Sequence, residues 1–213
     1  MARLTVIRHA ETMWNRERRM QGQTDTMLSD VGRAQAAALG ERLAGLSFVA
    51  LYSSDLSRAW DTAHAIARRT GHEVIAEPNL RERRFGIFEG LTYAEINERH
   101  PEALQRFQSR DPDYVIPGGE SGRDFHARCL ACLIAIAERH DGCDVAVVTH
   151  GLVLDALYRA AHGLTFDVPR PVPLINASLN GFGYTERVWR MSFWGDVAHL
   201  EPAAITRYEG RAA

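Results

Sequence analysis

The sequence has no lysine, so all 25 of its basic residues are arginine. A Walker-type phosphate loop needs a lysine that reaches the phosphates, and a Schiff-base enzyme needs a lysine amine. The composition therefore excludes both of these classes, together with a lysine general base.

Cysteines and long apolar runs are also few. Cys129, Cys132 and Cys143 are an odd number and too few for a disulfide framework in 213 residues. No apolar run approaches the ~20 residues that a membrane-spanning helix needs, and the chain does not begin with a basic segment followed by an apolar stretch. We therefore expect a cytoplasmic protein in a reducing compartment, with no membrane partner.

Basic and acidic residues are nearly equal in number. The 25 basic and 27 acidic residues are spread along the chain and give a formal net charge of -2. Nucleic-acid binding needs a basic face, so we expect no nucleic-acid partner. No linker divides the chain, and its length allows one sizeable core. The expectation is a single domain over residues 1–213.

Three short apolar runs lead directly into polar residues. The runs at residues 4–7, 48–52 and 145–148 are followed by Arg8 and His9, by Arg58, and by His150, respectively. Continuous apolar runs are typical of parallel strands that helices cover on both faces, and ligands bind beyond the carboxyl ends of such strands. Because guanidinium groups match the oxygens of phosphate, the pattern predicts a phosphate site at one edge of a sheet.

Helices alternate with these runs, which predicts a three-layer α/β/α fold with a doubly wound, mostly parallel sheet. Helices are expected from Ser29 to about Leu43, from Asp55 or Ser57 to Gly71, from Ser121 onward, and over 152–162. A further strand is expected at 73–76, and an edge hairpin at 178–184 and 188–194 that turns near Glu186 and Arg187. Residues 80–120 break the alternation and predict a helical and loop insertion over the carboxyl ends of the strands, where substrate preference would be decided.

Cys129 and Cys132 have the spacing of a redox pair or half a zinc site. A redox pair normally lies at a helix N-terminus, whereas these two lie inside a predicted helix, on its apolar stripe with Leu133 and Ile136. No second Cys or His pair completes a zinc site. We expect both cysteines to pack in the core and predict no metal site.

The first of the apolar runs belongs to a longer motif. The segment from Val6 through Arg8, His9, Ala10 and Glu11 to Thr12, with Asn15 following, resembles the signature of the histidine phosphatase superfamily, in the branch that also holds the cofactor-dependent phosphoglycerate mutases. The likeness continues in the family's order through Gln21-Gly22, Leu28-Ser29, Ser53 to Ala59, Leu80-Arg81-Glu82, Glu89-Gly90, Gly119-Glu120-Ser121 and Thr149-His150-Gly151. One such motif would be weak, but the ordered set is specific.

The resemblance implies a role for each of these residues. His9 would be the nucleophile that becomes phosphorylated, and Glu82 the general acid that protonates the leaving oxygen and then activates water. The implied phosphate-binding residues are Arg8, Asn15, Gln21, Gly22, Arg58, His150 and Gly151. No metal or cofactor is implied, because the arginines supply the neutralising charge.

Some residues are assigned no catalytic part. Glu11 and Glu89 are interpreted as structural, and the other seven histidines as surface or core residues. Arg81, Arg83 and Arg84 either extend the positive potential of the site or are merely solvated. The same two interpretations apply to Arg16, Arg18 and Arg19. Ala10 stands where the family usually has glycine, which would distort the site if the backbone needed a positive φ there.

The leading hypothesis is a phosphomonoesterase that acts on a small phosphorylated metabolite. The first alternative is a phosphoglycerate mutase primed by 2,3-bisphosphoglycerate, but mutases of this family carry a longer insertion than the compact segment from Gln108 to Asp113. The second is a non-catalytic phosphate-binding module, which is disfavoured because every implied catalytic residue is present. A homodimer is compatible with the sequence.

Overall fold

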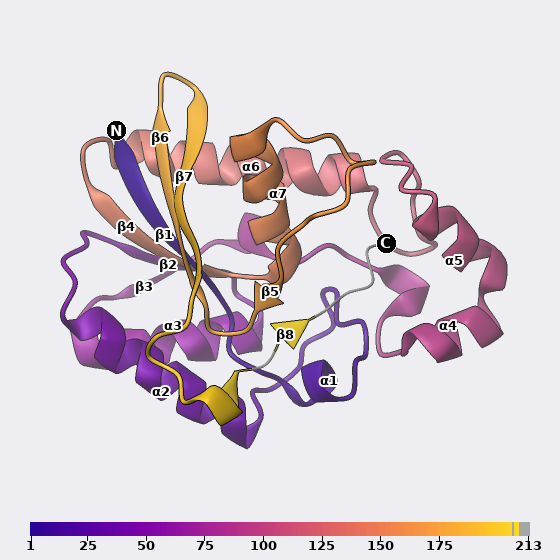
Figure 1. Cartoon of the computed structure of the whole chain (residues 1–213), viewed down its shortest axis with the longest axis horizontal. Helices are drawn as coiled ribbons and strands as arrows, with labels where there is room; N and C mark the ends of the chain where they lie inside the picture. Colours follow the sequence, from indigo (N-terminus) through magenta and orange to yellow (C-terminus); the bar gives the residue numbers. More distant parts are fainter. Residues whose placement is uncertain (206, 209–213) are drawn as a thin grey trace.

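The computed structural model describes residues 1–205 and the backbone of 207–208, and strands and helices alternate along most of it (Figure 1). The strands are β1 Ala2–Arg8, β2 Leu51–Ser53, β3 Val74–Ala76, β4 Asp144–Thr149, β5 Leu174–Ile175, β6 Leu179–Thr185, β7 Val188–Asp196 and β8 Arg207–Tyr208. The α-helices are α1 Met13–Arg16, α2 Asp30–Ala44, α3 Ser57–Thr70, α4 Tyr93–Arg99, α5 Pro101–Gln108, α6 Gly122–Arg139 and α7 Gly151–His162. Short 3₁₀ turns span Pro78–Leu80, Gly86–Phe88 and Pro202–Ala204.

The main sheet has six strands in the order β3-β2-β4-β1-β6-β7. The first four run parallel, β6 is antiparallel to β1, and β7 is antiparallel to β6. This is the predicted mostly parallel sheet. Strands β5 and β8 form a separate antiparallel pair.

The second strand is shorter than expected. We predicted that this strand begins at Phe48. Its pairing with neighbouring strands on both sides begins only at Leu51, which lies opposite Val74 of β3 and Ala146 of β4. Val49 has a partner on one side only, through the bond of its N–H to the carbonyl of Asp144, and its side chain is exposed.

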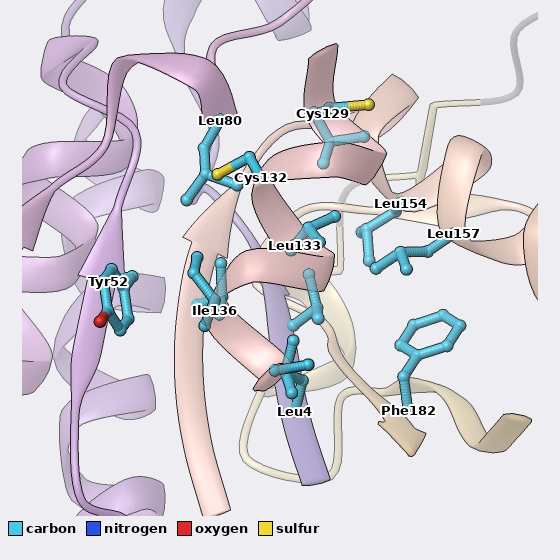
Figure 2. Close-up of a cluster of buried hydrophobic side chains, with 14 of the residues drawn as sticks. Leu4, Tyr52, Leu80, Cys129, Cys132, Leu133, Ile136, Leu154, Leu157 and Phe182 are labelled. Atoms are coloured by element: carbon cyan, nitrogen blue, oxygen red, sulfur yellow. The ribbon is translucent and has the colours of Figure 1, made fainter. Parts of the chain in front are cut away.

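Helices cover both faces of the sheet, with α6 and α7 on one side and α2 and α3 on the other (Figure 1). Successive strand residues point to opposite faces, so Leu4 and Val6 pack under α6 and α7, whereas Ile7 packs with α2 and α3. Figure 2 shows the first of these clusters, in which Leu133 of α6 packs among neighbours from the sheet and from α7. The three-layer architecture is as predicted.

Cys129 and Cys132 lie in the cluster of Figure 2, on the buried side of α6. Both are free thiols, and burial raises the pKa of each to about 12. Thiolates rather than thiols are reactive, so these shifts disfavour a reactive role for either cysteine. Their burial confirms the prediction that both pack in the core.

The two antiparallel strands β6 and β7 form the predicted hairpin. Glu186 and Arg187 connect them, with φ values of 49° and 62°. Positive φ at both central residues is typical of the type I′ turn, whose twist suits a two-residue hairpin.

Helices α4 and α5 belong to the predicted insertion and lie to one side of the sheet, at the right in Figure 1. Thr92 and Glu95 form a capping box at the start of α4, and Pro101 occupies the first turn of α5. These helices pack around Phe88, Ile96 and Leu104 in a small core of their own.

Candidate active site

The ends of three parallel strands are level with one another. Arg8, the last residue of β1, lies opposite Thr149, the last residue of β4, and Ser53 of β2 lies opposite Val148. The next residues of β1 and β4 are His9 and His150, and their rings lie 5.2 Å apart between centroids. The structure thus brings the two predicted histidines together.

The imidazole of His9 is held in one tautomer. Its Nδ1 lies 2.7 Å from the carbonyl oxygen of Ala10. A carbonyl can only accept a hydrogen bond, so Nδ1 carries the proton and Nε2 keeps a lone pair. Burial, and secondarily the charges of Arg58 and Arg8, hold the pKa of His9 well below 6.5. The ring is therefore neutral at physiological pH.

His150 is fully buried and contacts the end of β2. Its Nε2 lies 2.8 Å from the hydroxyl of Ser54, whose oxygen also accepts from the N–H of Leu56. Burial, then the charge of Arg58, holds the pKa of His150 well below 6.5. Its Nδ1 is buried and has no hydrogen-bond partner among the residues that the structure describes.

Arg8 and Arg58 place two guanidinium groups beside these rings. Nη1 of Arg8 donates to the carbonyl of Leu174 at 2.9 Å. Arg58, the second residue of α3, is fully buried and donates to the carbonyls of Gly22 and Thr24. Desolvation lowers the pKa of Arg58 to about 10, so the group remains a cation at neutral pH.

The only carboxyl group among the predicted catalytic residues is that of Glu82, which is half-buried and lines the cleft. Its oxygens accept from the backbone N–H groups of Arg83 at 2.8 Å and of Leu152, in the first turn of α7, at 3.1 Å. Desolvation nevertheless dominates, and the pKa of Glu82 is raised above 4.5. A carboxyl group in this state is suited to donate a proton.

A cleft of about 200 Å³ opens over these groups. The other predicted phosphate-binding residues, Asn15, Gln21, Gly22 and Gly151, all line it. The amide oxygens of Asn15 and Gln21 accept from Thr12 and Thr26, respectively, which leaves their N–H groups as donors. His150 does not line the cleft directly.

The glycine at position 151 lets α7 begin close to the site. A Cβ there would lie 3.1 Å from Leu174 and 3.5 Å from Nε of Arg8. Since the N-terminus of a helix favours anions, α7 presents its positive end beside Arg8.

The outer wall of the cleft comes from the insertion and from the segment after α7. Arg83, Phe107, Tyr114 and Phe166 all line it. His126 also lines it, with its ring centroid 4.5 Å from that of Phe166. We had expected His126 to be an ordinary surface or core residue. Its position depends on packing between α6 and the distant residue Phe166, which the sequence pattern does not reveal.

The six arginines whose role the sequence left open fall into two groups. Arg19 and Arg83 line the cleft. Arg81 instead forms a bidentate ion pair with Asp55, and Arg16, Arg18 and Arg84 are exposed. The sequence alone could not distinguish these cases, because neighbouring residues in a loop point in different directions.

Two polar residues at the site were not predicted from the sequence. Ser54 lies inside the motif from Ser53 to Ala59, but that motif does not reveal its contact with His150. Asn176 donates to the carbonyl of His9 at 3.0 Å from 167 residues further along the chain. No local signal points to Asn176.

Ala10 does not disturb the backbone. Its φ is negative, so the position does not need glycine. The residue is buried, and its N–H donates to the hydroxyl of Thr62 at 3.1 Å. The substitution of alanine for the usual glycine is therefore accommodated.

Comparison with known proteins identifies the family of the chain. The model of the histidine phosphatase superfamily (branch 1) matches residues 4–197. The chain belongs to this superfamily. Two relatives from Arabidopsis thaliana are similar over most of its length. Phosphoglycerate mutase-like protein 4 is 41% identical, covering 94% of this chain and 87% of that one. Metal-independent phosphoserine phosphatase is 42% identical, covering 92% and 82%.

The solved structure of Bacillus stearothermophilus YhfR shares the fold of this superfamily member. Its TM-score is 0.86 at 34% identity, and the match covers 94% of this chain and all of that one. Within the described residues, no group of three or more His, Cys, Asp or Glu side chains could hold a metal ion. No helix among them is long and apolar enough to cross a membrane.

Proposed function

We propose that the protein is a phosphomonoesterase that hydrolyses a small phosphorylated metabolite through a phosphohistidine on His9. The observation that carries the proposal is the tautomer of His9. The bond to Ala10 fixes the proton on Nδ1, and the lowered pKa keeps the ring neutral. The Nε2 lone pair is therefore available to attack phosphorus at physiological pH.

The arginines bind the phosphoryl group during that attack. Arg8 and Arg58 both line the cleft with His9, and their charges oppose that of the phosphoryl oxygens throughout the transfer. The N–H groups of Asn15, Gln21 and Gly151 add neutral donors. Phosphate binding by His150 remains a prediction, since its ring lies 5.2 Å from that of His9 between centroids but does not line the cleft.

Glu82 acts on the other side of the phosphorus. In the first step it protonates the oxygen of the leaving alcohol, which a raised pKa favours. In the second step the resulting carboxylate takes a proton from the water that attacks the phosphohistidine. His9 is then released neutral and inorganic phosphate leaves.

The mutase alternative differs only in the second acceptor, which would be a hydroxyl of the substrate instead of water. It draws support from the relative named phosphoglycerate mutase-like protein 4. The phosphatase is favoured by the compact segment from Gln108 to Asp113 and by the relative named metal-independent phosphoserine phosphatase. The phosphatase reaction needs neither metal nor cofactor, whereas the mutase reaction would need 2,3-bisphosphoglycerate as a primer. We place the protein in the cytoplasm, without nucleic-acid or membrane partners.

Trapping of the phosphoenzyme tests the proposal. The wild type, mixed with a ³²P-labelled phosphomonoester and quenched in base during turnover, should retain label on the protein that is stable in alkali and labile in acid. His9→Ala should retain none. The control is His64→Ala, which removes a histidine that bonds within α3 and lies outside the cleft. Label that persists in His9→Ala would refute the assignment of the nucleophile.

A further inference from the structure

The position of Arg58 depends on a loop without regular secondary structure. Its guanidinium donates from Nη2 to the carbonyl of Gly22 at 2.6 Å and from Nη1 to the carbonyl of Thr24 at 3.1 Å. No carboxylate bonds to it among the residues that the structure describes, and Nε has no hydrogen-bond partner there. The two carbonyls of the loop therefore determine where the charge of Arg58 lies.

One carboxylate holds that loop. The side chain of Glu89 accepts from the backbone N–H of Gln23 at 3.1 Å, from that of Thr24 at 2.8 Å, and from the hydroxyl of Thr24. It also accepts from the N–H of Phe85 at 2.8 Å. The carboxylate therefore receives four donors from two separate segments of the chain.

The approach of Glu89 to the loop requires a glycine. Gly22 has a φ of +57°, and a Cβ there would overlap the carboxylate of Glu89. Left-handed backbone and close approach are the two properties that glycine alone provides without strain. Thus the glycine of the loop, the carbonyl that it offers to Arg58 and the carboxylate form one packed unit.

We propose that Glu89 is a positioning residue for Arg58: its carboxylate fixes the loop whose carbonyls hold the guanidinium in place for phosphoryl transfer. The inference rests on the proposed function, since it concerns the transition state of that reaction. Glu89 does not transfer a proton, because its carboxylate accepts from four donors of the protein and does not line the cleft.

A charged carboxylate is needed for this arrangement. Ionised Glu has four lone-pair sites, whereas Gln has one acceptor oxygen and an NH₂ group that would face N–H donors. Two backbone bonds, from Met20 to Leu91 and from Gly90 to Met20, still connect the two segments when the side chain changes. Glu89→Gln should therefore loosen the loop and leave the fold in place.

A double-mutant cycle with Arg58 separates positioning from a general structural effect. The rate of enzyme phosphorylation by nitrophenyl phosphate is measured in single turnover for the wild type, Glu89→Gln, Arg58→Ala and the double variant. Small displacements of catalytic groups can cost about 100-fold, so we expect Glu89→Gln to lose roughly 10- to 100-fold when Arg58 is present. In the Arg58→Ala background the same change should cost less than about threefold, because nothing is left to position.

Glu77→Gln is the matched control. It removes another half-buried carboxylate that accepts a backbone N–H and a side-chain N–H, but both donors belong to Asn79, and Glu77 does not line the cleft. Its rate should remain within about threefold of the wild type, the same limit as in the cycle. If the folding of Glu89→Gln is impaired, Thr24→Val removes one of the four donors more gently and should show a smaller loss that also vanishes without Arg58.

Equal losses from Glu89→Gln in both backgrounds would overturn the inference and leave Glu89 as a structural residue only. So would a loss in Glu77→Gln as large as that in Glu89→Gln. Failure of the wild type to become phosphorylated at all would instead contradict the proposed function, so the two failures are distinguishable.

Discussion

Burial shifts the pKa values of the nucleophile, His9, and of the proton donor, Glu82, in opposite directions. Water exclusion disfavours the charged form of each group, which lowers the pKa of His9 and raises that of Glu82. Each shift therefore favours the form that the reaction needs, which is unprotonated His9 and protonated Glu82. Two groups with pKa values displaced in this way are suited to nucleophilic and acid catalysis at one site.

This displacement predicts the pH dependence of the first chemical step. Phosphorylation needs neutral His9, present above a pKa that lies well below 6.5, and protonated Glu82, present below a pKa that lies above 4.5. Its rate should therefore fall as pH rises through the raised pKa of Glu82. Single-turnover rates with an alkyl phosphate from pH 4 to 9 measure this. A Glu82→Gln profile that kept the same alkaline decline would assign the ionisation to another group.

The leaving group offers a second test of Glu82. General acid catalysis is typically worth about 10² to 10⁴ in rate, and an alkoxide needs it far more than nitrophenolate does. Glu82→Gln should therefore slow phosphorylation by an alkyl phosphate much more than by nitrophenyl phosphate. The measurement must be the single-turnover phosphorylation rate, because dephosphorylation by water uses the same carboxylate with both substrates. Equal losses would contradict the acid role.

At the level of elements, the start of α3 shows how a helix with an unfavourable sequence is stabilised by another segment. Its N-cap residue, Leu56, has no capping side chain, and Arg58 places a positive charge in the first turn, where the helix dipole opposes it. Asp25, from the loop before α2, supplies the missing cap by accepting from the N–H and hydroxyl of Ser57.

Loss of this cap should be measurable in the stability of the fold. Replacement of a capping side chain by alanine typically costs about 0.5 to 2 kcal/mol, so Asp25→Ala should lower the free energy of unfolding by about 1 kcal/mol. Urea denaturation provides the measurement. Asp30→Ala is the control, since Asp30 is exposed in the first turn of α2, where Ser29 supplies the cap. An unchanged midpoint in Asp25→Ala would show that solvent replaces the cap.

At the level of the whole molecule, the cleft is lined by elements from all parts of the chain. The strand ends supply the phosphate site, the insertion supplies Phe107 and Tyr114, and α6 and the segment after α7 supply His126 and Phe166. Burial lowers the pKa of His126 to about 4. The folded protein therefore holds this imidazole uncharged over a range in which the unfolded chain protonates it.

The linkage predicts a pH-dependent stability. A histidine whose pKa is lower in the folded state stabilises the fold above pH 6.5, and this contribution is lost as pH falls toward 4. Between pH 7 and 4.5 the loss due to His126 should be about 2 kcal/mol, given about 1.4 kcal/mol per pKa unit. The unfolding free energy of His126→Gln should fall less steeply than that of the wild type over this range, whereas His162→Gln, at an exposed position, should follow the wild type. Parallel curves for all three proteins would contradict the assignment.

The sequence by itself determined the layered fold and the edge of the sheet at which the site lies. Apolar runs specify buried parallel strands, and the carboxyl ends of such strands meet at one edge. Arg8, His9, Arg58 and His150 could therefore be predicted to converge before any contact was known. Local signals of capping and turn formation likewise predicted the start of α2 at Ser29 and the turn at Glu186 and Arg187.

The tertiary structure alone decided which side chains hold those groups in place. Asn176 reaches His9, Asp25 caps α3, His126 enters the cleft wall, and Glu89 binds the loop around Gly22. Each of these contacts joins residues that are well separated in the chain, and its formation depends on the direction and reach of individual side chains. Sequence periodicity reports which face of an element is buried, but it carries no information about which distant segment meets that face.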